Sequence, residues 1–152
     1  MTLIGQVNPA QILTMNILFL CVGNSARSQI AEGLAKEMFP ETFHVESAGS
    51  MPANSVHDGA IKCMHEIGID ISNQYPKTVE ELDDAFIKDL DFVITLCAEE
   101  ICPLMSNDAK KIHWPNPDPA NENLSLRQQE LMFRESRENI FNMLKKFFTN
   151  LN

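Results

Sequence analysis

The segment Ile17–Ser28, ILFLCVGNSARS, decides how the rest of the chain can fold. Its first part is a continuous apolar run, which is typical of a strand in the centre of a parallel sheet. Its second part is small and polar and leads directly into a helical pattern. The sequence therefore predicts a buried strand over Asn16–Cys21, a tight loop, and a helix that begins near Ser28.

The loop between this strand and this helix has the features of an anion-binding site. The first N–H groups of a helix lack intrahelical partners, and together with the helix dipole they attract negative charge. Loop residues of the Gly-Asn-Ser type tolerate the dihedral angles that curl backbone N–H groups around one anion. The arginine adds a planar fork of donors that suits two oxygens at once. The residues expected to bind a tetrahedral oxyanion are Val22, Gly23, Asn24, Ser25, Ala26 and Arg27.

The thiol at the start of the loop is the candidate nucleophile. A positive field that binds an anion also stabilises a thiolate, so Cys21 is expected to act as a nucleophile at neutral pH. Ser28 is placed to donate its hydroxyl to that thiolate. The alternative is a small buried hydrophobic residue, which is the usual role of a lone cysteine in a strand. The loop composition, the arginine and the following helix together favour the nucleophile.

Residues 21–33, CVGNSARSQIAEG, resemble the phosphate-binding loop of the low-molecular-weight protein tyrosine phosphatase superfamily. They are most similar to its arsenate reductase branch, in which a Gln follows the loop arginine and serine, as Gln29 does here. The resemblance covers the chain from about Met15 to the last helix. It implies an α/β fold with three layers, in which a four-stranded parallel sheet carries helices on both faces.

Alternating strand and helix patterns independently predict a parallel sheet that is covered on both faces. Ligands of such sheets bind beyond the carboxyl ends of the strands, where both Cys21 and Cys97 are expected to lie. On the helix after the second strand, we expect a structural Cys63 and a solvated His57. The further strands are expected over Phe43–Ser47, Phe92–Leu96 and Lys111–Trp114. The helices are expected over Ser28–Phe39, from a Ser55 cap to Ile67, over Val79–Lys88, and after a Ser125 cap.

An Asp-Pro pair lies in a stiff, proline-rich loop, with Asp118 followed by Pro119. Phosphatases of the superfamily carry such a pair over the active site, so the resemblance implies that Asp118 is the general acid. General acids contribute about 10²–10⁴-fold to a rate. The alternative is an aspartate that only caps a turn. Phosphotyrosine phosphatases usually have an aromatic residue next, and Ala120 suits a small inorganic oxyanion better.

Two further cysteines, Cys97 and Cys102, follow the strand expected over Phe92–Leu96. Such a pair does not help to hydrolyse a phosphate ester, but it can relay a disulfide. The resemblance implies that Cys21 attacks arsenate, that Cys97 then forms a disulfide with it and releases arsenite, and that Cys102 takes over the disulfide. An external thiol reductant, of the thioredoxin or the glutaredoxin and glutathione type, is then required, and no bound cofactor is expected. The alternatives are two unreactive thiols or a zinc site, for which the nearby ligands are too few.

Some members of this branch hold a potassium ion near the loop. Asn24, Glu32 and Ser47 match part of that site. Tyr75 and Lys77, however, stand where Thr and Asp ligands are expected. The sequence therefore predicts no obligatory potassium and no metal site.

Composition limits the class of partner. The chain has 152 residues, 44% hydrophobic content and a net charge of −9. These values fit one domain with a proper core and argue against nucleic acid or an anionic membrane as a partner. Four cysteines do not suggest a secreted disulfide framework, and no apolar run has the length of a membrane span. We expect a disordered extension over residues 1–14, without signal-peptide character, a single domain over 15–152, and a cytoplasmic location.

Two enzymatic functions and one binding function are compatible with these residues. Reduction of arsenate, a detoxifying reaction, uses the loop cysteine and the cysteine pair, and it explains the small residue after the Asp-Pro pair. Hydrolysis of phosphate monoesters by a low-molecular-weight protein tyrosine phosphatase, through a phosphocysteine, needs Cys21, Arg27 and Asp118 and leaves the cysteine pair unused. A phosphate-binding or redox-sensing protein without turnover needs no Asp118. Arsenate reduction explains the most residues and is the predicted function.

Overall fold

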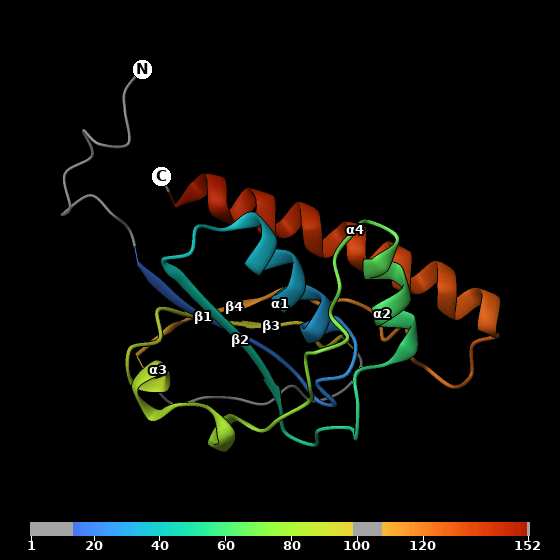
Figure 1. Cartoon of the computed structure of the whole chain (residues 1–152), viewed down its shortest axis with the longest axis horizontal. Coiled ribbons are helices and arrows are strands. Elements are labelled where there is room, and N and C mark those ends of the chain that lie inside the picture. The colour runs from blue at the N-terminus through green and yellow to red at the C-terminus, as the bar shows by residue number, and fades with distance from the viewer. Residues whose placement is uncertain (1–13, 99–107, 152) are drawn as a thin grey trace.

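The computed structural model describes residues 14–98 and 108–151. In this part of the chain, four parallel strands form one sheet in the order β2-β1-β3-β4 (Figure 1). The strands are β1 (Met15–Cys21), β2 (Phe43–Gly49), β3 (Phe92–Thr95) and β4 (Lys110–His113). The helices are α1 (Arg27–Met38), α2 (Asp58–His65), the 3₁₀-helix η3 (Val79–Glu81), α3 (Asp84–Lys88) and α4 (Leu126–Asn150).

The sheet is covered on both faces, which confirms the predicted three-layer α/β fold. Successive residues of β1 face opposite layers. Ile17 and Phe19 pack in the cluster that includes residues of α1, α2 and α4, whereas Leu18 and Leu20 pack in the cluster of the η3–α3 segment. All four side chains are fully buried. Figure 1 shows α1, α2 and α4 on one side of the sheet and α3 on the other.

The strand register brings two cysteines to the same edge of the sheet. Cys21, the last residue of β1, pairs with Gly49 of β2, and Leu20 pairs with Thr95 of β3. Cys97 follows β3 by two residues. Because the strands are parallel, both cysteines lie at the carboxyl edge, where open α/β sheets bind their ligands.

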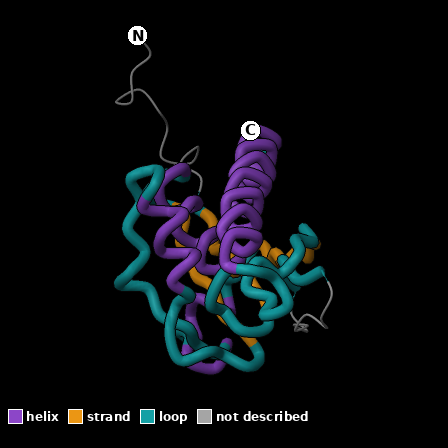
Figure 2. The backbone as a smooth tube through the Cα atoms, turned by 90° about the vertical axis from the view of Figure 1, so that its right-hand side faces the viewer, coloured by secondary structure: helices purple, strands orange, loops and turns teal. Residues whose placement is uncertain are grey.

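The long helix α4 begins at the predicted Ser125 cap. The Ser125 side chain accepts the N–H of Gln128, and the Gln128 side chain accepts the N–H of Ser125, which forms a capping box. Figure 2 shows this helix running beside the other helices of its layer. A buried stripe along it faces α1 and α2. It consists of Phe133, Ser136, Ile140, Leu144 and Phe147. Neither α4 nor any other helix in the described part of the chain combines the length and the apolar character needed to cross a membrane.

The start and end of α2 differ from the prediction. His57, not Ser55, caps the helix, because its Nδ1 accepts the N–H of Gly59 at 2.9 Å. The centre of the His57 ring also lies 4.9 Å from that of Phe133, so this histidine is half-buried rather than solvated. Ile67 lies beyond the end of the helix and is 44% exposed.

The helix expected over Val79–Lys88 is two short helices. Thr78 and Glu81 form a capping box at η3, and the Asp83 side chain caps α3. Between them the backbone of Leu82 is extended and its side chain is buried against the sheet. The second cap interrupts the helix because its side chain offers the backbone another hydrogen-bond partner.

Candidate active site

The loop after β1 turns its carbonyl groups toward other parts of the chain. The carbonyls of residues 22–25 all accept hydrogen bonds, three of them from backbone N–H groups within residues 51–57. The fourth, that of Asn24, accepts Nε2 of Gln29 at 2.9 Å. The C=O and N–H of a trans peptide point in opposite directions. The N–H groups of residues 23–26 are therefore directed away from these partners, as an anion-binding nest requires.

Two backbone features allow this shape. Asn24 has a φ of 47°, in the left-handed region that asparagine tolerates better than most residues. Gly49 lies against the loop so closely that a Cβ there would be 2.4 Å from the carbonyl oxygen of Val22. Any larger residue at this position would displace the loop from β2.

The Asn24 side chain fixes the direction of the hydrogen bond at Cys21. The backbone N–H of Lys77 can only donate, so the amide oxygen of Asn24 faces it, at 3.0 Å. The amide nitrogen then donates to Ser28 Oγ at 2.8 Å and to Ser47 Oγ at 2.9 Å. Ser28 Oγ lies 2.9 Å from Cys21 Sγ. The hydrogen bond from Asn24 occupies one lone pair of the Ser28 oxygen and leaves its proton free to be donated to a Cys21 thiolate, which can only accept. The Ser28 hydroxyl is thus in hydrogen-bond contact with the candidate nucleophile.

Arg27 lies beside the loop and is held by a contact with Asn116 that the sequence analysis did not predict. It is 4% exposed, and its Nη1 donates to the carbonyl of Asn116 at 2.8 Å. Asn116 is itself buried, and its N–H donates to the carbonyl of Leu96 after β3 at 3.0 Å. The flanking residues Pro115 and Pro117 restrict the backbone that presents this carbonyl. The Pro-Asn-Pro pattern is the one sequence signal for this contact.

Asp118 is half-buried two residues after Asn116. Its Oδ1 accepts the N–H of Ala120 at 2.9 Å, which is the turn-capping contact of the alternative interpretation. The contact orients the carboxyl group, and the Arg27–Asn116 hydrogen bond anchors the loop at the edge of the sheet that carries Cys21. The role of Asp118 as the acid stays a prediction.

The described cysteines differ in state. Cys21 and Cys63 are free thiols, and Cys97, which is 1% exposed, is disulfide-bonded. Cys102 lies outside the described residues. Burial in α2 raises the pKa of the Cys63 thiol from 9.0 to about 11. This agrees with the structural role expected for Cys63.

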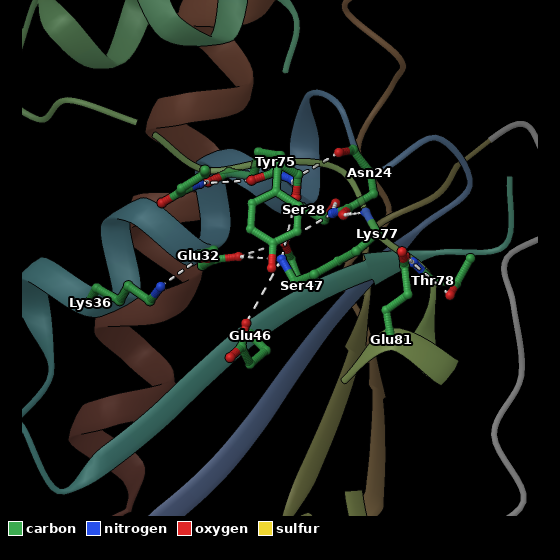
Figure 3. A network of polar contacts seen from close by, with 12 residues as sticks. Asn24, Ser28, Glu32, Lys36, Glu46, Ser47, Tyr75, Lys77, Thr78 and Glu81 are labelled. Atoms are coloured by element: carbon green, nitrogen blue, oxygen red, sulfur yellow. Dashed lines mark hydrogen bonds and ion pairs between the residues drawn. The ribbon is translucent and has the colours of Figure 1, made fainter. Parts of the chain in front are cut away.

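The residues that match part of a potassium site surround a lysine instead (Figure 3). Nζ of Lys77 lies 3.7 Å from Glu32 Oε1 and 3.8 Å from Glu46 Oε1. Ser47 also donates to Glu32, at 2.6 Å. These residues do not fit a potassium ion, because the buried Lys77 ammonium group already brings to the Glu32 carboxylate the positive charge that the ion would bring. Within residues 14–98 and 108–151, no three His, Cys, Asp or Glu side chains are grouped to hold a metal ion.

Comparison with known proteins agrees with this geometry. Residues 16–152 match the family described as low molecular weight phosphotyrosine protein phosphatase. An arsenate reductase of Bacillus subtilis (strain 168) is 41% identical over 133 residues, which are 86% of this chain and 93% of that protein. A solved arsenate reductase in the phosphate binding state is 29% identical, with a TM-score of 0.73, and covers 91% of this chain and 100% of the other. For a thioredoxin-dependent arsenate reductase of Corynebacterium glutamicum the identity is 29% and the TM-score 0.68, over 96% of this chain and 64% of the other.

The family match spans nearly the whole sequence, and the relatives named as arsenate reductases confirm the resemblance of residues 21–33. The chain therefore belongs to the low molecular weight phosphotyrosine protein phosphatase family, and within it to the arsenate reductase branch.

Proposed function

We propose that this protein reduces arsenate to arsenite through an adduct on Cys21 and a disulfide relay. The observation that carries the proposal is the shared edge of the sheet, since Cys21 ends β1 and Cys97 follows the neighbouring strand β3. An anion-binding loop alone does not distinguish arsenate from phosphate. A second cysteine at the same edge does, because a thiol can reduce an arsenic–sulfur adduct but serves no purpose in ester hydrolysis.

In the first step, the Cys21 thiolate attacks arsenic and an As–S bond forms. One arsenate oxygen leaves as water after it has gained protons, one of them from Asp118. The Ser28 hydroxyl stabilises the sulfur anion before the attack. Arg27 and the N–H groups of residues 23–26 hold the remaining oxygens.

In the second step, the Cys97 thiolate attacks the sulfur of Cys21. An S–S bond forms and the As–S bond breaks, and its electron pair reduces As(V) to As(III), which leaves as arsenite. Cys102 then attacks Cys97, so that Cys21 is released as a thiol and the disulfide moves to Cys97 and Cys102. A free Cys21 with a disulfide-bonded Cys97 agrees with the end of this relay.

An external dithiol of the thioredoxin or glutaredoxin type reduces the final disulfide. The thioredoxin-dependent relative from Corynebacterium glutamicum supports a thioredoxin-type partner. Such dithiols are kept reduced in the cytoplasm, which is where we propose that the reaction takes place.

The test is to incubate the fully reduced protein with arsenate and to measure arsenite, beside the hydrolysis of an aryl phosphate. We expect about one arsenite per chain without a reductant and continued formation when a thioredoxin system is added. If the protein hydrolyses the aryl phosphate but forms no arsenite, the proposal is wrong and the second candidate function, that of a phosphatase, takes its place. The Asp118-Pro119 pair is the observation that favours that candidate.

A further inference from the structure

Lys77 and Glu32 carry buried charges that the proposed reaction does not use. Lys77 is 5% exposed and Glu32 is 3% exposed. Nζ of Lys77 also donates to the carbonyl of Tyr75 at 3.4 Å and lies 4.9 Å from the centre of its ring. Charges are costly to bury even when they are paired. An ion pair buried next to the anion-binding loop therefore calls for an explanation.

A chain of hydrogen bonds connects this ion pair to the nucleophile, and Figure 3 shows the chain as far as Ser28. Ser47 Oγ lies 2.6 Å from Glu32 Oε1 and 2.9 Å from Asn24 Nδ2. The same nitrogen of Asn24 lies 2.8 Å from Ser28 Oγ, which is 2.9 Å from Cys21 Sγ. Four hydrogen bonds thus separate the Glu32 carboxylate from the thiol.

The carboxylate and the Asn24 amide together fix the direction of the bonds in this chain. An ionised carboxylate can only accept, so Ser47 donates to Glu32 and accepts from Asn24. Both N–H groups of the Asn24 amide are then committed to hydroxyl oxygens, and Ser28 is left with its proton for Cys21. If Glu32 moved away, Ser47 would lose its acceptor, and the Asn24 amide, which donates to Ser28, would lose the support of a fixed Ser47 hydroxyl.

We propose that Lys77 is a positioning residue, whose ammonium group is the built-in counter-charge that holds Glu32 as the terminal acceptor and thereby keeps Ser28 donating to Cys21. Its backbone N–H orients the Asn24 amide in the same network. The role rests on the proposed function, in which Cys21 is the nucleophile. It has a direct consequence for the enzyme, which carries its own cation and needs no potassium from solution.

A second lysine provides the matched control. Lys36 also contacts Glu32, with Nζ 2.6 Å from Oε2, but its side chain is 51% exposed. Solvent screens such a charge, and an exposed i,i+4 pair contributes little. The side chain of Lys77 is 6% exposed, so its charge acts on Glu32 with little screening.

Three variants of Lys77 separate charge from packing. Lys77→Ala removes the charge and leaves space beside the carboxylate, Lys77→Met fills the space without charge, and Lys77→Arg keeps the charge. We expect Lys77→Ala and Lys77→Met to slow the alkylation of Cys21 by iodoacetamide about ten- to a hundredfold, the range of one charge-assisted hydrogen bond. Lys77→Arg and the control Lys36→Ala should stay within about threefold of the wild type.

Added cations provide a readout that a purely structural role would not move. At constant ionic strength, ammonium or potassium ions should restore alkylation in Lys77→Ala, whereas the larger tetramethylammonium ion should not. Neither Lys77→Met nor the wild type should respond. Wild-type alkylation rates in Lys77→Ala and Lys77→Met would overturn the proposal, and so would a loss in Lys77→Ala that small cations leave unchanged. If Lys77→Ala fails to fold, a slow Lys77→Met beside a fast Lys77→Arg supports the proposal, and equal rates overturn it.

Alkylation needs no arsenate, so it tests Lys77 separately from the reaction. The same variants are then given one equivalent of arsenate, and the rate of arsenite release in a single turnover is measured. If the wild type releases no arsenite while the alkylation pattern holds, the proposed function fails and the role of Lys77 stands. If the wild type releases arsenite and the Lys77 variants release it equally fast, only the role of Lys77 fails.

Discussion

Three features act on the sulfur of Cys21, namely the Ser28 hydroxyl at 2.9 Å, the outward-turned N–H groups of the loop, and the start of α1. None of them ionises a hydroxyl. We therefore expect Cys21→Ser to lose arsenite formation and aryl phosphate hydrolysis together, to below about a thousandth of the wild-type rates. Both rates are measured on the same preparation, and substantial arsenite formation by this variant would refute Cys21 as the nucleophile.

Cys63 is the internal control among the thiols. Burial raises its pKa to about 11, so at about pH 8 only about one molecule in a thousand carries the thiolate. Cys63→Ala should keep arsenate turnover within about twofold and lower the free energy of unfolding by about 1–2 kcal/mol. Turnover and urea unfolding check the two effects. A tenfold loss of turnover in the folded variant would assign Cys63 to the reaction.

At the scale of elements, Glu66 ties the end of α2 to α4. It accepts hydrogen bonds from Arg134 Nη2 at 2.7 Å and from Arg137 Nη1 at 2.8 Å. The hydrogen bonds from Arg134 and Arg137 lower the pKa of this carboxyl from 4.5 to about 2. A lowered pKa contributes stability that is complete above the unfolded value and is lost as the pH falls toward the folded value. Glu66→Gln should therefore cost about 1 kcal/mol at neutral pH, and the difference from the wild type should shrink between pH 4.5 and about 2.

Glu138→Gln is the control for this pair of helices. Among the described residues, Glu138 forms one ion pair, in which its carboxylate lies 2.9 Å from the Nε of Arg137. Its side chain is 59% exposed. The free energy of unfolding should change by less than about 0.5 kcal/mol at every pH. The free energy of unfolding of both variants is measured by denaturant unfolding at several pH values. An equal loss in both variants would show that Glu66 contributes no more than an exposed charge.

The elements that follow from local patterns could be predicted from the sequence. The apolar run before Cys21 indicates the central strand, and the Ser125 cap indicates the start of α4. His57 replaces Ser55 as the cap of α2, because a ring from α4 packs on it, and no local pattern contains that contact. The same holds for the site. Cys21, Arg27 and Ser28 lie in one segment and could be found, whereas the partner of Arg27 is 89 positions away.

The role of Lys77, which stands where some members of the branch have a potassium ligand, could not be predicted from the sequence alone. In the sequence, a lysine where a potassium ligand is expected argues only against that ion. In the folded chain, its ammonium group lies 3.7 Å from Glu32, and its backbone N–H holds Asn24. The ion pair with Glu32 and the hydrogen bond to Asn24 depend on how distant segments lie in the folded chain, and the hydrophobic periodicity of the sequence does not specify this.

At the scale of the whole molecule, the parallel sheet brings an anion-binding loop and a second cysteine to one edge. Hydrolysis needs only the loop, and reduction needs both. Cys97→Ser should therefore lose arsenite release while the hydrolysis of an aryl phosphate stays within about threefold of the wild type. Loss of both activities in a folded variant would mean that Cys97 supports the loop rather than the relay.

The most direct test of the relay is the identity of the disulfide that forms when its last step is blocked. Fully reduced Cys102→Ser is exposed to arsenate without any other reductant, and its cysteine linkages are mapped by peptide mass spectrometry. We expect about one arsenite per chain, followed by arrest with a disulfide between Cys21 and Cys97. Cysteines that all remain reduced, with no arsenite released, would contradict the reduction of arsenate by this chain.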